Sequence, residues 1–253
     1  MHILAPISAV ALLLASAATA QSFEPARLDA HIKTLSSDAF EGRGPATPGE
    51  QKTVAYLVQQ LQAAGLEPGG EVVNGERQWT QRVPLLQSDI VGDPVITFHG
   101  GQDWRLQQGP DIAIRSPLNG QTQIRLDKAP MVFVGYGVAA PERGWDDFKG
   151  EDVKGKVIVV LVNDPDFEGG EGSFGGKAMT YYGRWTYKYE EAARRGAAGV
   201  IIVHETVPAS YGWATVQNSN TNTMFDIVRQ DPGRTHAPVN GWIQLDHARA
   251  LFK

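Results

Sequence analysis

The sequence feature that most constrains the fold is a strand–helix–strand pattern between Ala129 and Val203. Val157–Val162 is an unbroken apolar run between turn residues, and Val200–Val203 is a second run of the same kind. Continuous apolar runs of this length are typical of strands that are buried on both faces of a parallel sheet. A helix over Tyr187–Arg195 separates the two runs. The pattern therefore predicts a βαβ unit, whose crossover should be right-handed.

The helix of this unit has an apolar stripe and a charged opposite side. Its stripe, at helical spacing, consists of Trp185, Tyr189, Ala192, Ala193 and Gly196. On the other side Glu190 and Glu191 each have an arginine four residues later, which is the favourable order for ion pairs. Gly196 suits the left-handed position after a helix. A shorter apolar segment, Met131–Val134, precedes the unit and predicts another strand.

Composition narrows the possible function classes. The chain has 253 residues, of which 42% are hydrophobic, which is enough for one large core or two small ones. Its formal net charge is −5 and it has no basic run, so we expect no nucleic-acid partner. It contains no cysteine, and therefore no disulfide.

The first twenty residues predict a signal peptide. The segment from Ile3 to Ala17 is almost wholly apolar, and Ala18-Thr19-Ala20 has the small-x-small form of a signal-peptidase site. We therefore expect export to the periplasm or the medium, with a mature chain that starts at Gln21 and has no membrane partner. The alternative is an uncleaved N-terminal anchor.

Two helices follow. Pro25–Ser36 places Leu28, Ile32 and Leu35 on one face. The next helix has a strong start, because Thr47 can be its N-cap, Pro48 stands at the first helical position and Glu50 completes a capping box. Gly65 should end it. Its predicted buried stripe consists of Val54, Leu57, Val58, Leu61 and Ala64.

Short strands are expected from Gln78 to Ile114. Trp79–Val83 alternates, and Val95–Phe98 and Trp104–Leu106 flank a predicted hairpin turn at His99–Asp103. Pro, Gly, Asn and Gln are frequent in Gln107–Gln123, which we interpret as loops on an antiparallel sheet.

Two connections in the second half are unusually long. Asn163–Thr186 and Thr206–His236 exceed ordinary loop lengths, and such loops are usually functional or mobile. A strand over Ala237–Ile243 and a helix capped by Asp246 are expected to follow. Because that helix runs to the last residue, Lys253, we expect the natural protein to continue.

Two groups of sequence blocks follow one another along the chain. The first group consists of Leu35–Gly44, Thr47-Pro48-Gly49 and the helix end Ala64–Pro68. The second group, within Ala129–Phe252, consists of Val132–Gly137, Val153–Val160, Glu191–Ile202 and Ala237–Ile243. In this order the blocks resemble the opening and the protease-associated (PA) domain of the M28 family of zinc aminopeptidases. The resemblance implies an α/β fold in which N-terminal helices and short strands precede a PA-like β-sandwich/α-β domain. The implied divisions are a signal peptide at 1–20, an N-terminal segment of the peptidase domain at 21–125, and a C-terminally truncated PA-like domain at 126–253.

The same resemblance implies an exported aminopeptidase that acts on peptides and uses two zinc ions in the full-length protein. In the family, the zinc site follows the PA domain and begins with a His-x-Asp motif. None of the six histidines here begins such a motif; they are His2, His31, His99, His204, His236 and His247. We therefore expect no catalytic, cofactor-binding or metal-binding residue in this chain, and no activity of the chain by itself.

Two other function classes stay open. The chain could be a stand-alone PA-like module that binds peptides or proteins, or, more distantly, a calcium- or carbohydrate-binding domain. A loose calcium site could use Asp164, Asp166 and Glu168, although Gly175 stands where a calcium loop needs a bidentate glutamate. A solvated acidic turn is the simpler interpretation.

Other chemical signals favour structural roles. His204-Glu205 starts like a zincin motif, but Pro208 stands where the second histidine ligand belongs. Gly175-Gly176-Lys177 lacks the spacing of a phosphate loop. An aromatic group could line a peptide-binding surface, although core or interface packing is favoured; it consists of Tyr181, Tyr182, Trp185, Tyr187 and Tyr189. Glu41 and Arg43 have no assigned role beyond bridging the first helices.

Overall fold

The computed structural model describes residues 23–100, 103–170 and 172–252, which form two compact units. One unit ends at Gln81 and the other begins at Arg82. The predicted signal peptide, residues 1–20, lies outside the described residues. Within the described ranges, no helix combines the length and the hydropathy that a bilayer crossing requires.

The first unit contains both predicted helices. Its elements are α1 (Pro25–Leu35), η1 (Asp38–Arg43), α2 (Pro48–Ala63), β1 (Val72–Val73) and β2 (Glu76–Arg77). Thr47 is the N-cap of α2, and its hydroxyl accepts a hydrogen bond from the Glu50 amide at 3.4 Å. The Glu50 carboxylate reaches back to the amide of Ala46, at 2.6 Å, one residue further than in the expected box. Gly65 has a φ of +78° and ends α2 as predicted.

The face of α2 that packs within this unit differs from the prediction. Gly49 and Thr53 are its buried residues, and the backbone of η1 passes so close to Gly49 that a side chain there would collide with the Phe40 carbonyl. Leu57 and Leu61 of the predicted stripe are 44% and 41% exposed. The stripe is therefore not buried within the described residues, and its side chains are short of packing partners, as expected for a helix that should pack on a peptidase sheet. The small residues of α2 admit η1 on another face.

Glu41 and Arg43 do bridge the first helices. The Arg43 guanidinium donates a hydrogen bond to the carbonyl of Leu35 at the end of α1, at 2.7 Å. Glu41 forms an ion pair with Lys52 of α2, with 3.3 Å between the charged atoms. Both residues thus hold η1 between the two helices.

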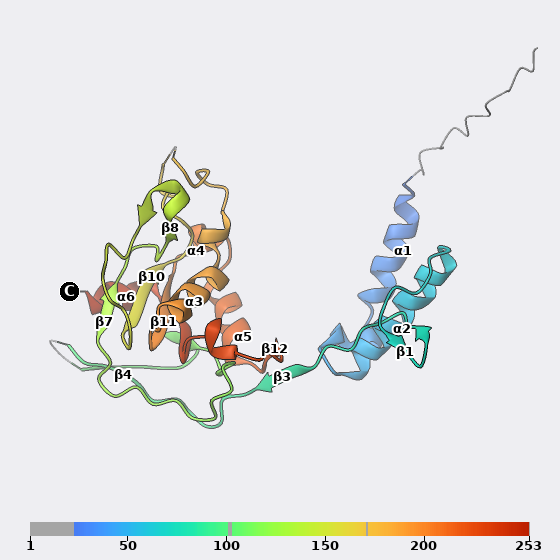
Figure 1. Ribbon diagram of the computed structural model, residues 1–253, viewed down its shortest axis with the longest axis horizontal. Coiled ribbons are helices and arrows are strands. Elements are labelled where there is room, and N and C mark those ends of the chain that lie inside the picture. Colours follow the sequence, from blue (N-terminus) through green and yellow to red (C-terminus); the bar gives the residue numbers. More distant parts are fainter. Residues whose placement is uncertain (1–22, 101–102, 171, 253) are drawn as a thin grey trace, which may run out of the picture. The chain divides into compact units, whose positions relative to one another are not determined.

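The second unit is built on a five-stranded sheet in the order β6-β13-β11-β10-β7. Figure 1 labels its strands β7, β10 and β11. Strands β7, β10, β11 and β13 are parallel, and β6 is antiparallel to β13. The α/β class and the strand–helix–strand unit are confirmed. The elements are β3 (Leu85–Ser88), β4 (Ile96–Phe98), β5 (Trp104–Leu106), β6 (Ile112–Ile114), β7 (Met131–Phe133), β8 (Ala139–Ala140), η2 (Pro141–Arg143), β9 (Trp145–Asp146), β10 (Val157–Leu161), η3 (Tyr181–Gly183), α3 (Trp185–Arg194), β11 (Gly199–His204), α4 (Thr206–Ala209), α5 (Trp213–Thr221), β12 (Met224–Ile227), η4 (Pro232–Arg234), β13 (Val239–Gln244) and α6 (Leu245–Leu251).

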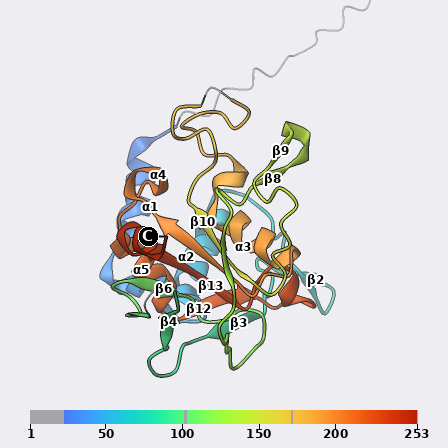
Figure 2. The same cartoon turned by 90° about the vertical axis from the view of Figure 1, so that its left-hand side faces the viewer.

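Both faces of this sheet are covered, which explains the continuous apolar runs. On one face Ile158, Val160 and Ile202 pack against α3 and α5. On the other face Val159 and Ile201 pack against α6 and the β4–β5 hairpin. Helix α6, beside the C-terminal label in Figure 2, follows directly on β13.

Three local predictions were wrong. Trp79–Val83 is not a strand. Gln107–Gln123 contains β6, a three-residue strand that is too short to show a period and is buried by its pairing with β13. Thr206–His236 contains α4, α5 and β12 instead of one long loop. Its helix α5 is rich in Asn, Ser and Thr, which favour turns and caps over helix interiors.

Two boundaries also differ from expectation. Helix α6 begins at Leu245, so its N-cap is Gln244, and Asp246 lies in the first turn. Strand β13 runs one residue beyond the predicted Ile243, which moves the helix start to the next residue. The second compact unit begins before residue 125, because β3 pairs with β12 and β6 pairs with β13.

Candidate functional site

The carboxyl ends of the parallel strands gather polar side chains at one edge of the sheet. Asn163 and Asp164 follow β10, His204 ends β11, and Gln244 ends β13. Ligands of open parallel sheets bind outside this edge, because successive loops converge there. Two features at this edge have unusual chemistry: a shallow pocket beside His204 and a buried amine at Lys188.

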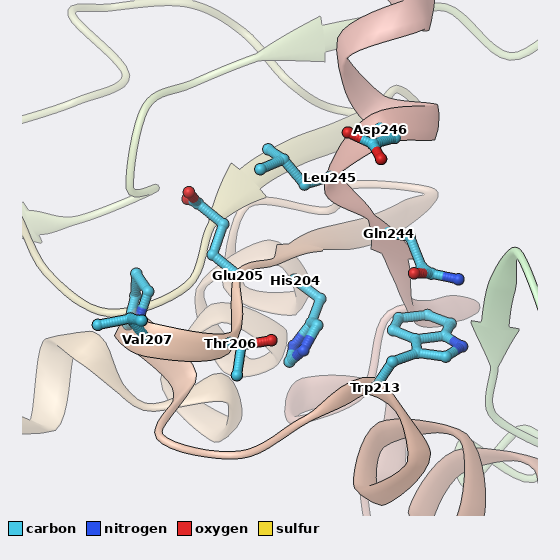
Figure 3. Close-up of a pocket in the computed structure, with 9 residues that line it drawn as sticks. His204, Glu205, Thr206, Val207, Trp213, Gln244, Leu245 and Asp246 are labelled. Atoms are coloured by element: carbon cyan, nitrogen blue, oxygen red, sulfur yellow. The ribbon is translucent and has the colours of Figure 1, made fainter.

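The pocket lies between the loop after β11 and the start of α6 (Figure 3). It has a volume of about 350 Å³ and opens to solvent. Its lining consists of His204, Glu205, Thr206, Val207, Pro208, Trp213, Gln244, Leu245 and Asp246. In the view of Figure 3 the carboxylates of Glu205 and Asp246 lie in the upper half, and the rings of His204 and Trp213 lie in the lower half.

His204 is enclosed by aromatic rings. Its imidazole is stacked on Tyr211, with 6.1 Å between ring centroids, and lies 5.6 Å from Trp213 and 6.0 Å from Trp242. The side chain is only 5% exposed, and neither ring nitrogen has a hydrogen-bond partner among the described residues. Burial lowers the pKa of His204, because desolvation disfavours the charged imidazolium.

Lys188 of α3 is a second unusual group. It is 1% exposed, and its ammonium donates hydrogen bonds to the carbonyls of Tyr136, at 2.5 Å, and Asn163, at 2.9 Å. These contacts tie the turn after β7 to the loop after β10. Burial lowers the Lys188 pKa to about 7, against the opposing field of Asp147 and Asp164.

The predicted acidic turn is a folded part of the second unit. Asp164 is fully buried, and its Oδ2 accepts hydrogen bonds from the amide and the hydroxyl of Thr180 at 3.0 Å and 2.8 Å. Asp166 accepts a hydrogen bond from the amide of Phe174 at 2.6 Å. Both carboxylates therefore fasten the long connection after β10.

The calcium alternative gains no support from this geometry. Over the described ranges, no three His, Cys, Asp or Glu side chains come together closely enough to hold a metal ion. Asp164, Asp166 and Glu168 therefore do not form such a group, and His204 and Glu205 do not belong to one.

The aromatic group is divided between core and surface. Tyr187 and Tyr189 are each 3% exposed, whereas Tyr181 and Trp185 are 53% and 39% exposed. Tyr182 packs on Tyr187, with 5.0 Å between ring centroids. Within the described part, core packing accounts for the buried members of the group.

The remaining motif candidates lie in structural positions. His204 stands at the end of β11, and Pro208 lies inside α4, so the zincin-like pair is a strand end followed by a short helix. Gly175-Gly176-Lys177 lies in a turn that does not open a helix. Neither the chemistry of Lys188 nor the pocket was predicted, because neither belongs to a sequence motif. The available signal was a lysine next to the apolar stripe of α3.

Comparison with known proteins identifies the core of the second unit. Residues 125–243 match the family model of the PA domain. This segment contains β7, β10, α3, β11 and most of β13, so the resemblance that the sequence showed is confirmed for this part of the chain.

A comparison with curated proteins gave no match. Among solved structures, an aminopeptidase from Aneurinibacillus sp. strain AM-1 matches with 18% sequence identity and a TM-score of 0.31. The match covers 81% of this chain and 35% of the aminopeptidase. The chain thus spans about a third of the length of that protein.

Proposed function

We propose that this chain, whose residues 125–243 are a PA domain, is the N-terminal part of an exported, zinc-dependent aminopeptidase that acts on peptides. The observation that carries the proposal is the order of the motifs. Segment Leu35–Pro68 resembles the M28 opening, and a match to the PA domain follows it, which is the order in exported members of that family.

Two structural features support the proposal that this chain is part of a larger peptidase. The first unit has an apolar stripe on α2 that its own elements leave largely exposed, as expected for a piece of a larger peptidase domain. The second unit has two covered sheet faces and a polar edge, which suits a module that covers or restricts a peptide cleft.

The described residues do not fit a catalytic zinc site. Such a site needs about three protein ligands and an open position. Among the histidines, only His204 begins a segment that is similar to a zincin motif. Aromatic rings surround its imidazole, and within the described ranges no cluster of three potential metal ligands includes it. The proposal therefore places the two zinc ions in a part of the full-length protein beyond this chain.

The coding sequence after Lys253 tests the proposal. A His-x-Asp motif within several dozen codons, followed by further carboxylates and a second histidine, is the expected result. A stop codon directly after Lys253 would favour the second candidate, a stand-alone PA-like module. The observation that keeps this candidate open is that the second unit has its own core on both faces of the sheet.

Export gives a separate prediction. The proposed signal peptide should be removed after Ala20, because small residues at Ala18 and Ala20 fit the signal peptidase. Mass spectrometry of the protein from periplasm or culture medium should find Gln21 at the N-terminus. Protein that is retained in cells with Met1 in place would contradict export.

A further inference from the structure

The connection that follows β10 has no regular structure of its own. Residues 164–170 and 172–180 (the connection) contain no helix or strand. Five glycines lie between positions 168 and 177. A glycine-rich segment gains much conformational freedom when it is released, and segments without ladder hydrogen bonds open more readily than core strands. The closed form of the connection therefore depends on specific contacts.

Contacts within the connection and to α3 hold the closed form. Asp164 binds the amide and the hydroxyl of Thr180, and Asp166 binds the amide of Phe174. The Phe174 ring is 1% exposed and packs in one cluster with Tyr187 of α3. These contacts fix the far part of the connection, whereas its beginning is fixed by a lysine of α3.

Lys188 joins α3 to the two segments that cover it. The chain turns away from β10 at Asn163, whose φ of +73° lies in the left-handed region and whose side chain donates to the Pro208 carbonyl at 2.8 Å. The ammonium of Lys188 donates one hydrogen bond to the Asn163 carbonyl, at 2.9 Å, and another to the Tyr136 carbonyl, at 2.5 Å. One amine therefore ties both the turn after β7 and the pivot of the connection to the helix.

The closed form encloses this amine without a counter-ion in contact. Lys188 is 1% exposed and forms no ion pair with any residue that the structure describes. Asp164 acts on it through its field, but its Oδ2 binds Thr180 and its Oδ1 has no hydrogen-bond partner among the described residues. An enclosed ammonium of this kind is unfavourable, whereas an ammonium in water is not. The closed connection therefore favours the neutral amine, and the open connection favours the ammonium.

The titratable groups around Lys188 come from every element that packs on it. Burial lowers the Lys188 pKa to about 7, and the fields of Asp147, after β9, and Asp164, after β10, oppose this shift. The ring centroid of Tyr187, beside it on α3, lies 5.8 Å from the Lys188 Nζ. Burial raises the pKa values of Tyr187 and of Tyr136, in the turn after β7, so both phenols keep their protons below about pH 10. Between about pH 7 and pH 10, these tyrosines do not titrate, whereas Lys188 exchanges a proton when the connection opens or closes.

We propose that Lys188 is a pH-sensitive latch on the connection. Above neutral pH the neutral amine holds the connection against α3, and uptake of a proton lets the connection open while the sheet stays folded. Opening brings water to Lys188 and uncovers Phe174 and Tyr187 at the carboxyl edge of the sheet. The latch belongs to the second unit alone and does not depend on the proposed peptidase activity.

Hydrogen exchange of single amides, followed by NMR on the full 253-residue chain, tests the latch. The Thr180 amide reports on the connection, because its hydrogen-bond partner is Asp164. The Ala64 amide, which bonds to the Gln60 carbonyl at the end of α2, is the control, because α2 belongs to the other unit.

The two amides should respond differently to pH when reclosing is faster than exchange. Exchange of an open amide accelerates about tenfold per pH unit, and proton linkage makes opening of the connection rarer by about the same factor between pH 8 and pH 9. The two effects cancel, so we expect the Thr180 rate to stay nearly constant from pH 8 to pH 9, while the Ala64 rate rises about tenfold.

Two variants assign the effect to the amine. Lys188→Met removes the titrating group and fills most of its volume, so the Thr180 rate should then rise about tenfold per pH unit, like that of Ala64. Lys154→Met, at an exposed position, should keep the constant rate. The Ile202 amide, in the buried strand β11, should exchange far more slowly than Thr180 at each pH, because opening of the connection leaves the sheet folded.

A Thr180 rate in the wild type that rises with pH as steeply as the Ala64 rate would overturn the proposal, and this result needs no variant. Thr180 exchange as slow as that of Ile202 would also overturn it, because the connection would then open only with the whole unit. A constant Thr180 rate that persists in Lys188→Met would assign the pH dependence to another group and remove Lys188 from this role. If Lys188→Met does not fold, the wild-type comparison of Thr180 with Ala64 decides.

Discussion

Replacing Val159 with Asp should unfold the second unit. Val159 is 0% exposed, lies in the middle of β10 between its two parallel neighbours, and packs on the face covered by α6. An unpaired carboxylate at that position costs several kcal/mol. The whole stability of a domain is only about 5–15 kcal/mol, so the loss is of the same order.

Circular dichroism and thermal melting of Val159→Asp measure this effect. The matched control is Val91→Asp in the same unit, because Val91 is 98% exposed and the same substitution should leave melting nearly unchanged. A soluble Val159→Asp variant with a cooperative melt like that of the wild type would contradict the position of β10 in the sheet.

Lys188 should give the second unit a stability that rises with pH. Its pKa is about 7 in the folded protein, against an ordinary value of 10.5, because burial disfavours the ammonium. Between about pH 7 and pH 10, the unfolded chain holds a proton on this lysine that the folded chain has lost. The free energy of unfolding therefore rises with pH across this window, and the Lys188 contribution is on the order of several kcal/mol.

Above this window tyrosines act in the opposite direction. Burial raises the pKa of Tyr187 to about 12, so its unfolded form ionises first and stability falls above about pH 10. The measurement should therefore stop near pH 10, before this second effect begins.

The measurement is urea unfolding at several pH values, for the wild type and for Lys188→Met. Methionine removes the titrating group while filling most of its volume, so the rise between pH 7 and pH 10 should disappear. Lys154→Met, at an exposed position in the same unit, should keep it. An identical pH dependence in the wild type and Lys188→Met would show that the buried amine does not titrate in this range.

The central strands of the sheet were predictable, because continuous apolar runs indicate strands that are buried on both faces. Val157–Val162 and Val200–Val203 are apolar at every position, because helices cover both faces of β10 and β11. The caps of α2 and α3 were also predictable, since Thr47, Gly65 and Gly196 each perform a local backbone role.

Elements that depend on distant partners were not predictable. Strand β6 has three residues and exists because it pairs with β13, more than a hundred residues later. Glu191 was expected on the exposed side of α3 but is buried, although its predicted ion pair with Arg195 does form, at 2.6 Å. The long connection after β10 folds back over α3 and encloses Tyr187 and Lys188, which helical periodicity alone did not place inside.

The candidate site was also predictable in its local features and not in the contacts between distant segments. The sequence placed His204 at a strand end, where the structure finds it. It could not show that Tyr211, Trp213 and Trp242 surround the ring, because these residues come from two segments that are distant in sequence from each other. The pocket arises from the pairing of β11 with β13, which is a tertiary property.

The proposed function makes this chain part of a zinc aminopeptidase whose metal ligands are not among its own residues. The most direct measurement is release of nitroaniline from aminoacyl-nitroanilides, with added zinc, by the 253-residue chain and by a version extended through the following domain. We expect zinc-dependent, chelator-sensitive release by the extended protein and none by the short chain. Zinc-dependent release by the short chain would reveal a metal site within these residues, and inactivity of both proteins would contradict the peptidase assignment.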